Sequence, residues 1–230
     1  MTLSKPIMVL LAEDHMVVRE GLRKLLEDET DICVTGEATT GREAVTLAKE
    51  LRPDVIVMDI AMPKLNGMEA TRHIRQENPA ARVIILSAHR DDAYVEYVME
   101  LGARGYLIKQ TSAHALAQAI REVHQGKIFF SPEVARRFQQ QHQMTLDRKG
   151  RATTQSTTLS RREAEVLQLI AEGYANKQIA GELGISIKTV EKHRDHLMQK
   201  LSIHDTAGLT RYAVASGAIE SSVQPTTLDG

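Results

Sequence analysis

The feature that most constrains the fold is a regular alternation of short apolar runs and helical patterns over the first 130 residues. The expected strands lie at about 7–12, 32–36, 54–58, 82–87 and 104–108, and the expected helices at about 15–29, 41–51, 66–77, 91–101 and 113–125. The runs at 55–58 and 83–86 are apolar without alternation, as in strands that are buried on both faces. The pattern therefore predicts an α/β fold, in which helices cover both faces of a five-stranded parallel sheet.

Charged residues follow three of the expected strands. Glu13 and Asp14 come after the first run, Asp59 after the third and Lys109 after the fifth. Because the carboxyl ends of parallel strands line one crevice, these side chains should meet in space. Crowded carboxylates repel one another and call for a cation. Mg²⁺ suits such a set, because it prefers oxygen ligands.

The charged residues at the expected strand ends allow two interpretations, one purely structural and one chemical. A lone aspartate at a strand end, such as Asp59, is often only a helix cap or a loop residue. Ser87 at the end of the fourth expected strand and Lys109 at the end of the fifth favour a phosphoryl-transfer site instead. In such a site a carboxylate accepts the phosphoryl group as an acyl phosphate. The cation and Lys109 neutralise the phosphoryl oxygens, and Ser87 donates a hydrogen bond to one of them.

The chain changes character after residue 130. Residues 139–158 are polar and lack a periodic apolar face, which predicts a flexible linker, with a segment ordered by a partner as the alternative. Four helical patterns without strands follow. The expected division is an α/β domain at 1–130, a linker at 131–158, a small all-α four-helix domain at 159–217 and a tail at 218–230.

The four helical patterns contain a helix-turn-helix. The expected helix caps are Ser160, Asn176, Ser186 and Asp205, and the second helix should end at Leu183 before Gly184. A short helix, a turn with glycine and a long helix can bind DNA, although many such hairpins do not. Basic and polar residues add weight to the DNA-binding interpretation. The candidate contacts are Lys177, Lys188, Thr189, Lys192, His193 and Arg194.

Composition sets limits on these interpretations. The net charge is −1, and residues 159–230 carry 8 basic against 9 acidic residues, so any DNA-binding face must be local. The single Cys33 has no internal disulfide partner, which favours a reducing compartment. No apolar run approaches the roughly 18 residues of a membrane span. A cytoplasmic location without a membrane partner is therefore expected.

Residues 7–127 resemble the receiver domain of a two-component response regulator, which has a flavodoxin-like fold. The resemblance rests on the pair Glu13-Asp14, on Asp59-x-x-Met62-Pro63-x-x-Asn66-Gly67, on Ser87-Ala88 and on Gly105-Tyr106-x-x-Lys109. It implies that Asp59 is the phosphoacceptor. It also implies that Mg²⁺ is bound by Asp14, Asp59 and the backbone carbonyl of Ala61, with Glu13 acting through water. Ser87 and Tyr106 match the switch pair of that family, although Tyr106 could be an ordinary aromatic residue at a strand edge.

Residues 159–217 resemble the LuxR-type helix-turn-helix domain. The matching markers run from Leu159-Ser160-x-Arg162-Glu163 through Asn176-Lys177-x-Ile179-Ala180 to Thr189-Val190-x-x-His193 and Lys200-Leu201. The resemblance implies that Lys188, Thr189, Lys192 and His193 lie nearest to DNA, with Lys177 on a phosphate. The resemblance also implies that the last helix, from Asp205 to Ser216, mediates dimerisation. The alternative is that this helix only closes the hydrophobic core.

Together the two resemblances identify a response regulator of the NarL/FixJ type. They imply a transcription regulator, not an enzyme, in which a histidine kinase phosphorylates Asp59 and promotes homodimerisation and binding to promoter DNA. A hydrolase with an aspartate nucleophile is the alternative from another class, but such enzymes usually have a second aspartate where this chain has Ala61. A regulator that binds DNA without phosphorylation is the third reading.

Overall fold

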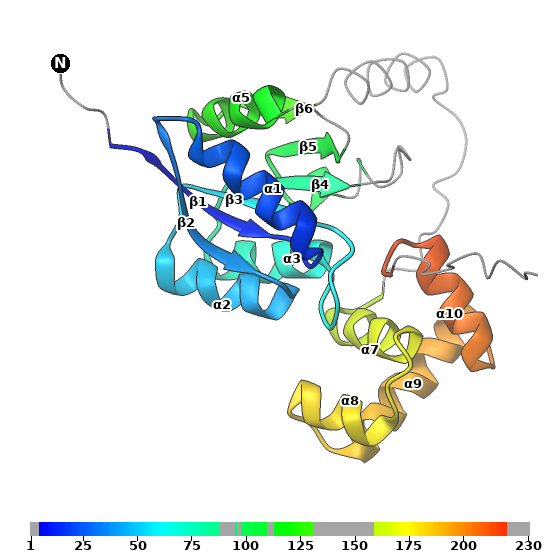
Figure 1. Cartoon of the computed structure of the whole chain (residues 1–230). Coiled ribbons are helices and arrows are strands. Elements are labelled where there is room, and N and C mark those ends of the chain that lie inside the picture. The colour runs from blue at the N-terminus through cyan, green and yellow to red at the C-terminus, as the bar shows by residue number, and fades with distance from the viewer. Residues whose placement is uncertain (1–4, 88–94, 96–97, 110–112, 131–158, 220–230) are drawn as a thin grey trace, which may run out of the picture.

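The fold is taken from a computed structural model, which describes residues 5–87, 95, 98–109, 113–130 and 159–219 (Figure 1). Its strands are β1 (Ile7–Ala12), β2 (Ile32–Ala38), β3 (Val55–Asp59), β4 (Val83–Ser87), β5 (Gly105–Ile108) and β6 (Phe129–Phe130). They form one parallel sheet in the order β2-β1-β3-β4-β5-β6. The α/β fold with a parallel sheet is thus confirmed.

Helices cover both faces of the sheet. They are α1 (Met16–Glu27), α2 (Gly41–Leu51), α3 (Gly67–Glu77) and α5 (Ala113–His124). Leu26 of α1 and Ile120 of α5 pack with the side chains of Val57 and Leu107 on one face. On the other face, Ala44 of α2 and Ile74 of α3 pack with Met58 and its neighbours. Both faces of the central strands are buried, which explains their apolar runs without alternation.

The sheet has one strand more than the five expected. After α5 the chain turns at Gly126, whose φ of 85° is unfavourable for residues with a side chain. The short strand β6 then pairs with β5, with Phe129 beside Gly105 and Phe130 beside Tyr106. Two residues are too few to produce a recognisable strand pattern. The helix expected at 91–101 and the linker expected at 131–158 lie largely or wholly outside the described residues.

The C-terminal region is helical throughout its described part. Its helices are α7 (Arg161–Ala171), α8 (Asn176–Leu183), α9 (Ile187–Leu201) and α10 (Thr206–Ala215). The side chains of Ser160, Ser186 and Asp205 cap α7, α9 and α10 as expected. The expected cap of α8 was wrong by one residue. Asn176 is the first residue of that helix, and the Ala175 N–H at the cap position donates to Gln178 Oε1.

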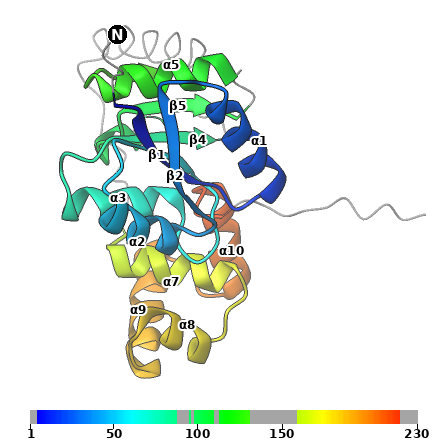
Figure 2. The same ribbon diagram turned by 60° about the vertical axis from the view of Figure 1, so that its left-hand side comes forward.

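The C-terminal helices pack against the α/β region where α7 contacts α3. Figure 2 shows α7 beneath α2 and α3, whereas α8 and α9 lie at the end of the molecule away from the sheet. The contact includes a hydrogen bond at 2.8 Å from the Asn66 N–H to the Gln168 side chain. Among the described residues, no helix is long and apolar enough to cross a membrane.

Candidate functional site

The charged residues expected to converge do meet at the carboxyl end of the sheet. Asp59 is the last residue of β3, Glu13 and Asp14 follow the adjacent β1, and Lys109 follows β5. The Lys109 ammonium lies 2.9 Å from Asp59 Oδ2 and 3.0 Å from Glu13 Oε2. A single lysine therefore bridges the two buried carboxylates.

Asp59 is a buried acid in an unfavourable environment. Its exposed fraction is 1%, and that of Glu13 is 0%. Burial is the main cause that raises the pKa of Asp59 from 3.8 to about 6, and the nearby Glu13 charge adds to it, although Lys109 opposes the shift. Asp59 Oδ1 has no hydrogen-bond partner among the described residues. A further cation beside this carboxylate would stabilise its charged form.

The pKa of Lys109 is also raised, but through different causes. Burial lowers the pKa of its ammonium, but the charges and hydrogen bonds of Asp59 and Glu13 together raise it above the ordinary value. The side chain is therefore cationic at neutral pH. It is placed to neutralise negative charge that develops on a group attached to Asp59.

His15 is a member of this cluster that the sequence interpretation missed. Its Nδ1 lies 2.9 Å from Asp14 Oδ1 and 3.1 Å from Glu13 Oε1. The Asp14 charge is the main cause that raises the pKa of His15, and Glu13 adds to the effect while burial opposes it. A histidine directly after an acidic pair was the available signal. It was overlooked because the expected cluster consisted of strand-end carboxylates.

The cluster fits a divalent cation. One potential ligand atom from each of Glu13, Asp14, His15 and Asp59 lies within 4.8 Å of the others. Asp59 Oδ1 has no hydrogen-bond partner in the described part of the chain, and Glu13 Oε2 has the Lys109 ammonium beside it. Carboxylate oxygens are hard ligands of the kind that Mg²⁺ prefers.

The segment after Asp59 turns back against the end of β3. The Gly67 N–H donates to the Ile60 carbonyl at 2.8 Å, which closes the loop over Ala61. A Cβ atom at Gly67 would clash with the carbonyl oxygen of Asp59. Asn66 caps α3 by accepting a hydrogen bond from the Glu69 N–H. This packing holds the start of α3 against the end of β3.

The two residues of the expected switch pair lie on neighbouring strands. Ser87 ends β4, and Tyr106 is the second residue of β5, where it pairs with Ile85. Both side chains are buried, with exposed fractions of 1% for Ser87 and 0% for Tyr106. Tyr106 is therefore a core residue in this structure, not an aromatic residue at an exposed edge.

The helix-turn-helix carries the other set of candidate residues. Gly184 ends α8 with a φ of 63°, and Ser186 caps α9 by accepting a hydrogen bond from the Thr189 N–H. This turn sets the direction in which α9 leaves α8. Lys188 and Lys192 are exposed on α9, and Lys177 is exposed at the start of α8.

The remaining candidate DNA contacts are less exposed to solvent. Thr189 and His193 are half-buried. The Arg194 guanidinium donates to Thr206 Oγ1 at 2.6 Å and to Asn176 Oδ1 at 3.4 Å. Arg194 thus ties α9 to α8 and α10, and it would have to leave these partners to contact DNA.

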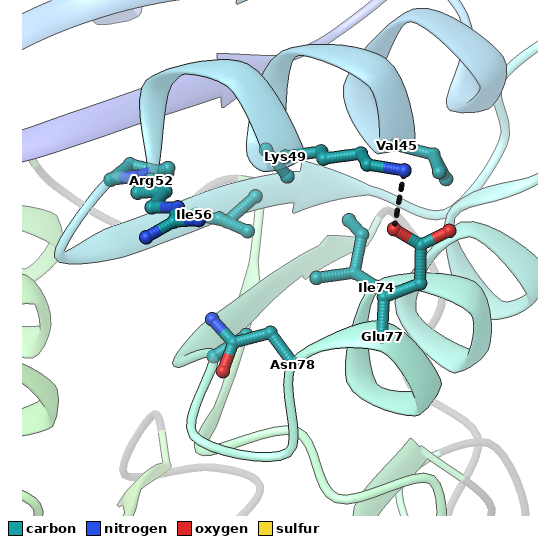
Figure 3. A pocket seen from close by; sticks show the side chains of 10 residues that line it. Val45, Lys49, Arg52, Ile56, Ile74, Glu77 and Asn78 are labelled. Carbon is teal, nitrogen blue, oxygen red and sulfur yellow. Dashed lines mark ion pairs between the residues drawn. The ribbon is translucent and has the colours of Figure 1, made fainter.

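A cavity of about 400 Å³ lies between α2 and α3. Figure 3 shows the ion pair of Lys49 and Glu77 beside it, with 3.6 Å between Nζ and Oε2. Ile56, near the start of β3, lines the cavity, whereas Asp59 ends that strand. The cavity is therefore separate from the acidic cluster.

Comparison with known families matches both halves of the chain. The model of the response regulator receiver domain matches residues 9–121, and the model of the luxR family of bacterial regulatory proteins matches residues 157–213. The first match contains the acidic cluster, and the second contains the helix-turn-helix. The motifs of the sequence therefore coincide with the regions that these families define.

Individual proteins match over nearly the whole chain. The transcriptional regulatory protein DegU of Brevibacillus brevis is 35% identical over 225 residues, which cover 93% of this chain and 95% of DegU. The response regulator VraR of Staphylococcus epidermidis is 36% identical over 214 residues, which cover 93% of this chain and 99% of VraR.

Solved structures agree with these relatives. RcsB of Salmonella enterica serovar Typhimurium, bound to promoter rprA in the presence of the phosphomimetic BeF3-, matches with a TM-score of 0.58 and 27% identity over 90% of this chain and 98% of RcsB. The receiver and helix-turn-helix regions thus occur in the same order in a protein that binds DNA. This chain belongs to the NarL/FixJ family of two-component response regulators, with a receiver domain followed by a LuxR-type DNA-binding domain.

Proposed function

We propose that Asp59 accepts a phosphoryl group from a sensor histidine kinase and that this reaction controls DNA binding. The observation that carries the proposal is the Lys109 ammonium at 2.9 Å from Asp59 Oδ2, beside an Asp59 Oδ1 with no hydrogen-bond partner among the described residues. A carboxylate oxygen attacks the phosphorus, and the bond to the donor nitrogen breaks. Lys109 and the Ser87 hydroxyl then stabilise the charge on the phosphoryl oxygens.

Mg²⁺ is the proposed cofactor of this reaction. Asp14 and Asp59 would hold it, with Glu13 acting through water. The backbone carbonyl of Ala61 would be a further ligand. The bound cation supplies positive charge that lowers the repulsion between the carboxylates and an incoming phosphoryl group. His15 competes for the same oxygens through its contacts with Asp14 and Glu13. Its imidazole must be neutral or displaced when the cation binds.

The donor would approach from the start of α1. Met16 and Val17 are 60% and 78% exposed, immediately after the acidic pair and His15. Large exposed apolar side chains beside a reactive group are suited to contact with another protein. The proposed partner is the kinase domain that carries the phosphohistidine, and the proposed location of the encounter is the cytoplasm.

Phosphorylation would act on the DNA-binding domain through the buried pair Ser87 and Tyr106. A shift of the Ser87 hydroxyl toward the phosphoryl group would open space that Tyr106 fills. The resulting change would promote a homodimer that binds a two-fold promoter site, because two-fold proteins favour two-fold operators. Lys177, Lys188 and Lys192 are proposed phosphate or base contacts, with Thr189, His193 and Arg194 beside them.

The first experiment is intact mass spectrometry of the full chain after incubation with acetyl phosphate and Mg²⁺. The control is Asp59→Asn, which preserves the shape of the side chain. A gain of one phosphoryl group in the parent alone supports Asp59 as the acceptor. A gain in both proteins places the chemistry on another residue, and no gain in the parent counts against acceptance from a small donor.

A further inference from the structure

The outward face of α9 carries charges of both signs. Residues three, four and seven positions apart lie on the same face of a helix. Four exposed residues of α9 have this spacing, namely Lys188, Glu191, Lys192 and Asp195. The buried residues Val190 and Leu197 lie on the opposite face, in the core of the C-terminal helices. The four charged side chains therefore form the part of α9 that points away from the protein, and we name them the outer face.

The side chains of the outer face are unpaired. None of the four has an ion pair or a hydrogen bond to another side chain in the described part of the protein. Carboxylates elsewhere in the domain do have cationic partners. Glu163 lies 2.6 Å from the Lys200 ammonium, and Glu182 lies 3.1 Å from Arg42 of the receiver. Both signs of charge on the outer face are therefore available to an external ligand.

The order of these charges does not favour the helix itself. Lys188 and Lys192 are four residues apart, and so are Glu191 and Asp195. Like charges at this spacing destabilise a helix. Lys188 also lies in the first turn of α9, where the helix dipole disfavours a cation. Helix stability therefore does not explain the arrangement, whereas a ligand with a matching pattern of donors and acceptors does.

The edges of the base pairs in the major groove supply such a pattern. Guanine presents the acceptors O6 and N7, and cytosine presents a donor, the N4 amino group. A lysine ammonium donates to guanine, and a carboxylate accepts from cytosine. Adenine also has an amino group, at N6, but its N7 acceptor lies beside that group and repels a carboxylate. Because the phosphates repel a carboxylate as well, a glutamate in the groove is favourable only opposite such an amino group.

We infer that Glu191 requires a cytosine at one position of each DNA half-site. Its carboxylate accepts a hydrogen bond from the N4 amino group of that base. Glu191 lies in the second turn of α9, and the N-terminal part of the second helix of a helix-turn-helix contacts base edges. Lys188 and Lys192 lie beside it on the outer face and offset the charge of the nearby phosphates. The inference rests on the proposed role of α9 in DNA binding.

The carboxylate also acts against wrong sequences. Where thymine replaces the cytosine, its O4 acceptor faces the Glu191 carboxylate, and neither group has a donor. Asp195 has a different effect, because it lies one turn further from the start of α9 and its side chain is one methylene shorter. It repels the phosphates of every sequence equally. Glu191 therefore selects a base, whereas Asp195 only lowers the overall affinity.

The test is the selection of bound sequences from a random duplex library by the full chain, with and without acetyl phosphate and Mg²⁺. The variants are Glu191→Ala, Glu191→Gln and Asp195→Asn. The control is Glu50→Gln, which makes the same change at an exposed glutamate of α2. Circular dichroism checks that each variant is folded. Fluorescence anisotropy then compares the selected duplex with one in which thymine–adenine replaces the cytosine–guanine pair.

The parent and Glu50→Gln should select the cytosine and lose about tenfold or more in affinity when thymine replaces it, because a wrong base pair costs about this factor. Glu191→Ala should reduce this ratio to about twofold or less. Glu191→Gln should change the preference to adenine, because an amide accepts from N6 and donates to N7. Asp195→Asn should bind all duplexes more tightly and still select the cytosine.

The outcomes separate this inference from the proposed function. If Glu191→Ala selects the same bases as the parent, the inference is wrong. An equal loss of the cytosine in Asp195→Asn would overturn it too, because the preference would then depend on the total charge of the outer face. In both cases DNA binding by α9 stands. If the parent binds no duplex in either condition, the proposed DNA binding fails and the inference fails with it.

Discussion

At the scale of single residues, the receiver buries negative charge at the carboxyl end of its sheet. Asp59 and Glu13 are buried beside each other with one lysine between them. Burial raises the pKa of Asp59 to about 6, with the Glu13 charge as a further cause. A carboxyl group that binds its proton more tightly when folded makes the folded state lose stability as pH rises from about 4 to about 6.

Asp59→Asn should therefore stabilise the protein at pH 7 when divalent cations are absent. The pKa difference between 3.8 and about 6 corresponds to about 3 kcal/mol in the free energy of unfolding, because one pKa unit is worth about 1.4 kcal/mol. Urea unfolding of the parent and the variant in EDTA, followed by circular dichroism, measures it. The difference should vanish below about pH 4, where Asp59 is protonated in both states. A variant less stable than the parent at pH 7 would contradict the argument.

At the scale of elements, the join between β3 and α3 controls the site. Gly67 must lack a side chain, because a Cβ atom there would clash with the Asp59 carbonyl. Gly21 in α1 has no atom within 4 Å of the corresponding Cβ position. The two glycines therefore form a matched pair, one required by a close contact and one not.

Gly67→Ala should lower the free energy of unfolding by about 2 kcal/mol and slow the phosphorylation of Asp59, because the loop must move to relieve the overpacking. Gly21→Ala should instead raise the free energy of unfolding by about 0.5–1 kcal/mol, because alanine favours the helix. Chemical unfolding and intact mass after acetyl phosphate treatment measure the two effects. Equal behaviour of the two variants would refute the role assigned to the join.

Helix α9 supports a prediction of its own. Lys192→Ala should weaken binding to a random-sequence DNA duplex and reduce the slope of log affinity against log salt by about 1, because one phosphate contact and its released counterion are lost. Fluorescence anisotropy over a range of salt concentrations measures the slope. Lys127→Ala changes an exposed lysine of the receiver and serves as the control. An unchanged slope for Lys192→Ala would remove this residue from the phosphate contacts.

Sequence patterns predicted the elements well where the signal was local. The apolar runs of β3 and β4 and the caps at Ser160 and Ser186 depend on neighbouring residues, and the structure has them as expected. The additional strand β6 depends on pairing with β5. Its two residues are too few to produce a recognisable strand pattern in the sequence. His15 joins the acidic cluster because its ring reaches back to Glu13, a contact that strand ends alone do not imply.

At the scale of the whole molecule, the two domains are held by contacts that local patterns do not contain. Gln168 lies between Leu167 and Leu169 in the most buried stretch of α7. A glutamine among buried residues was the available signal for a tertiary partner. That partner lies 102 residues earlier at Asn66, so only the assembled structure identifies it.

The charges at the interface should contribute measurably to docking. Arg42→Glu should weaken docking by placing like charges opposite each other, and Glu182→Arg should do the same. The double variant restores the pair with reversed signs and should recover much of the loss. Each effect should be about 1 kcal/mol or less, because both side chains are partly exposed. Hydrogen exchange of the Lys64 amide, which donates to Glu172, measures docking. Additive losses in the double variant would exclude a direct interaction.

The exposure of Lys188 and Lys192 in the docked arrangement has a kinetic consequence. Under the proposed function, a protein whose α9 is exposed while its two domains are docked can already slide and hop along the chromosome through phosphate contacts. The signal would then act on molecules that are searching near their targets, not on a pool that must first diffuse to DNA. The delay between stimulus and promoter occupancy would be set by phosphoryl transfer and pairing of two copies, with the search already under way.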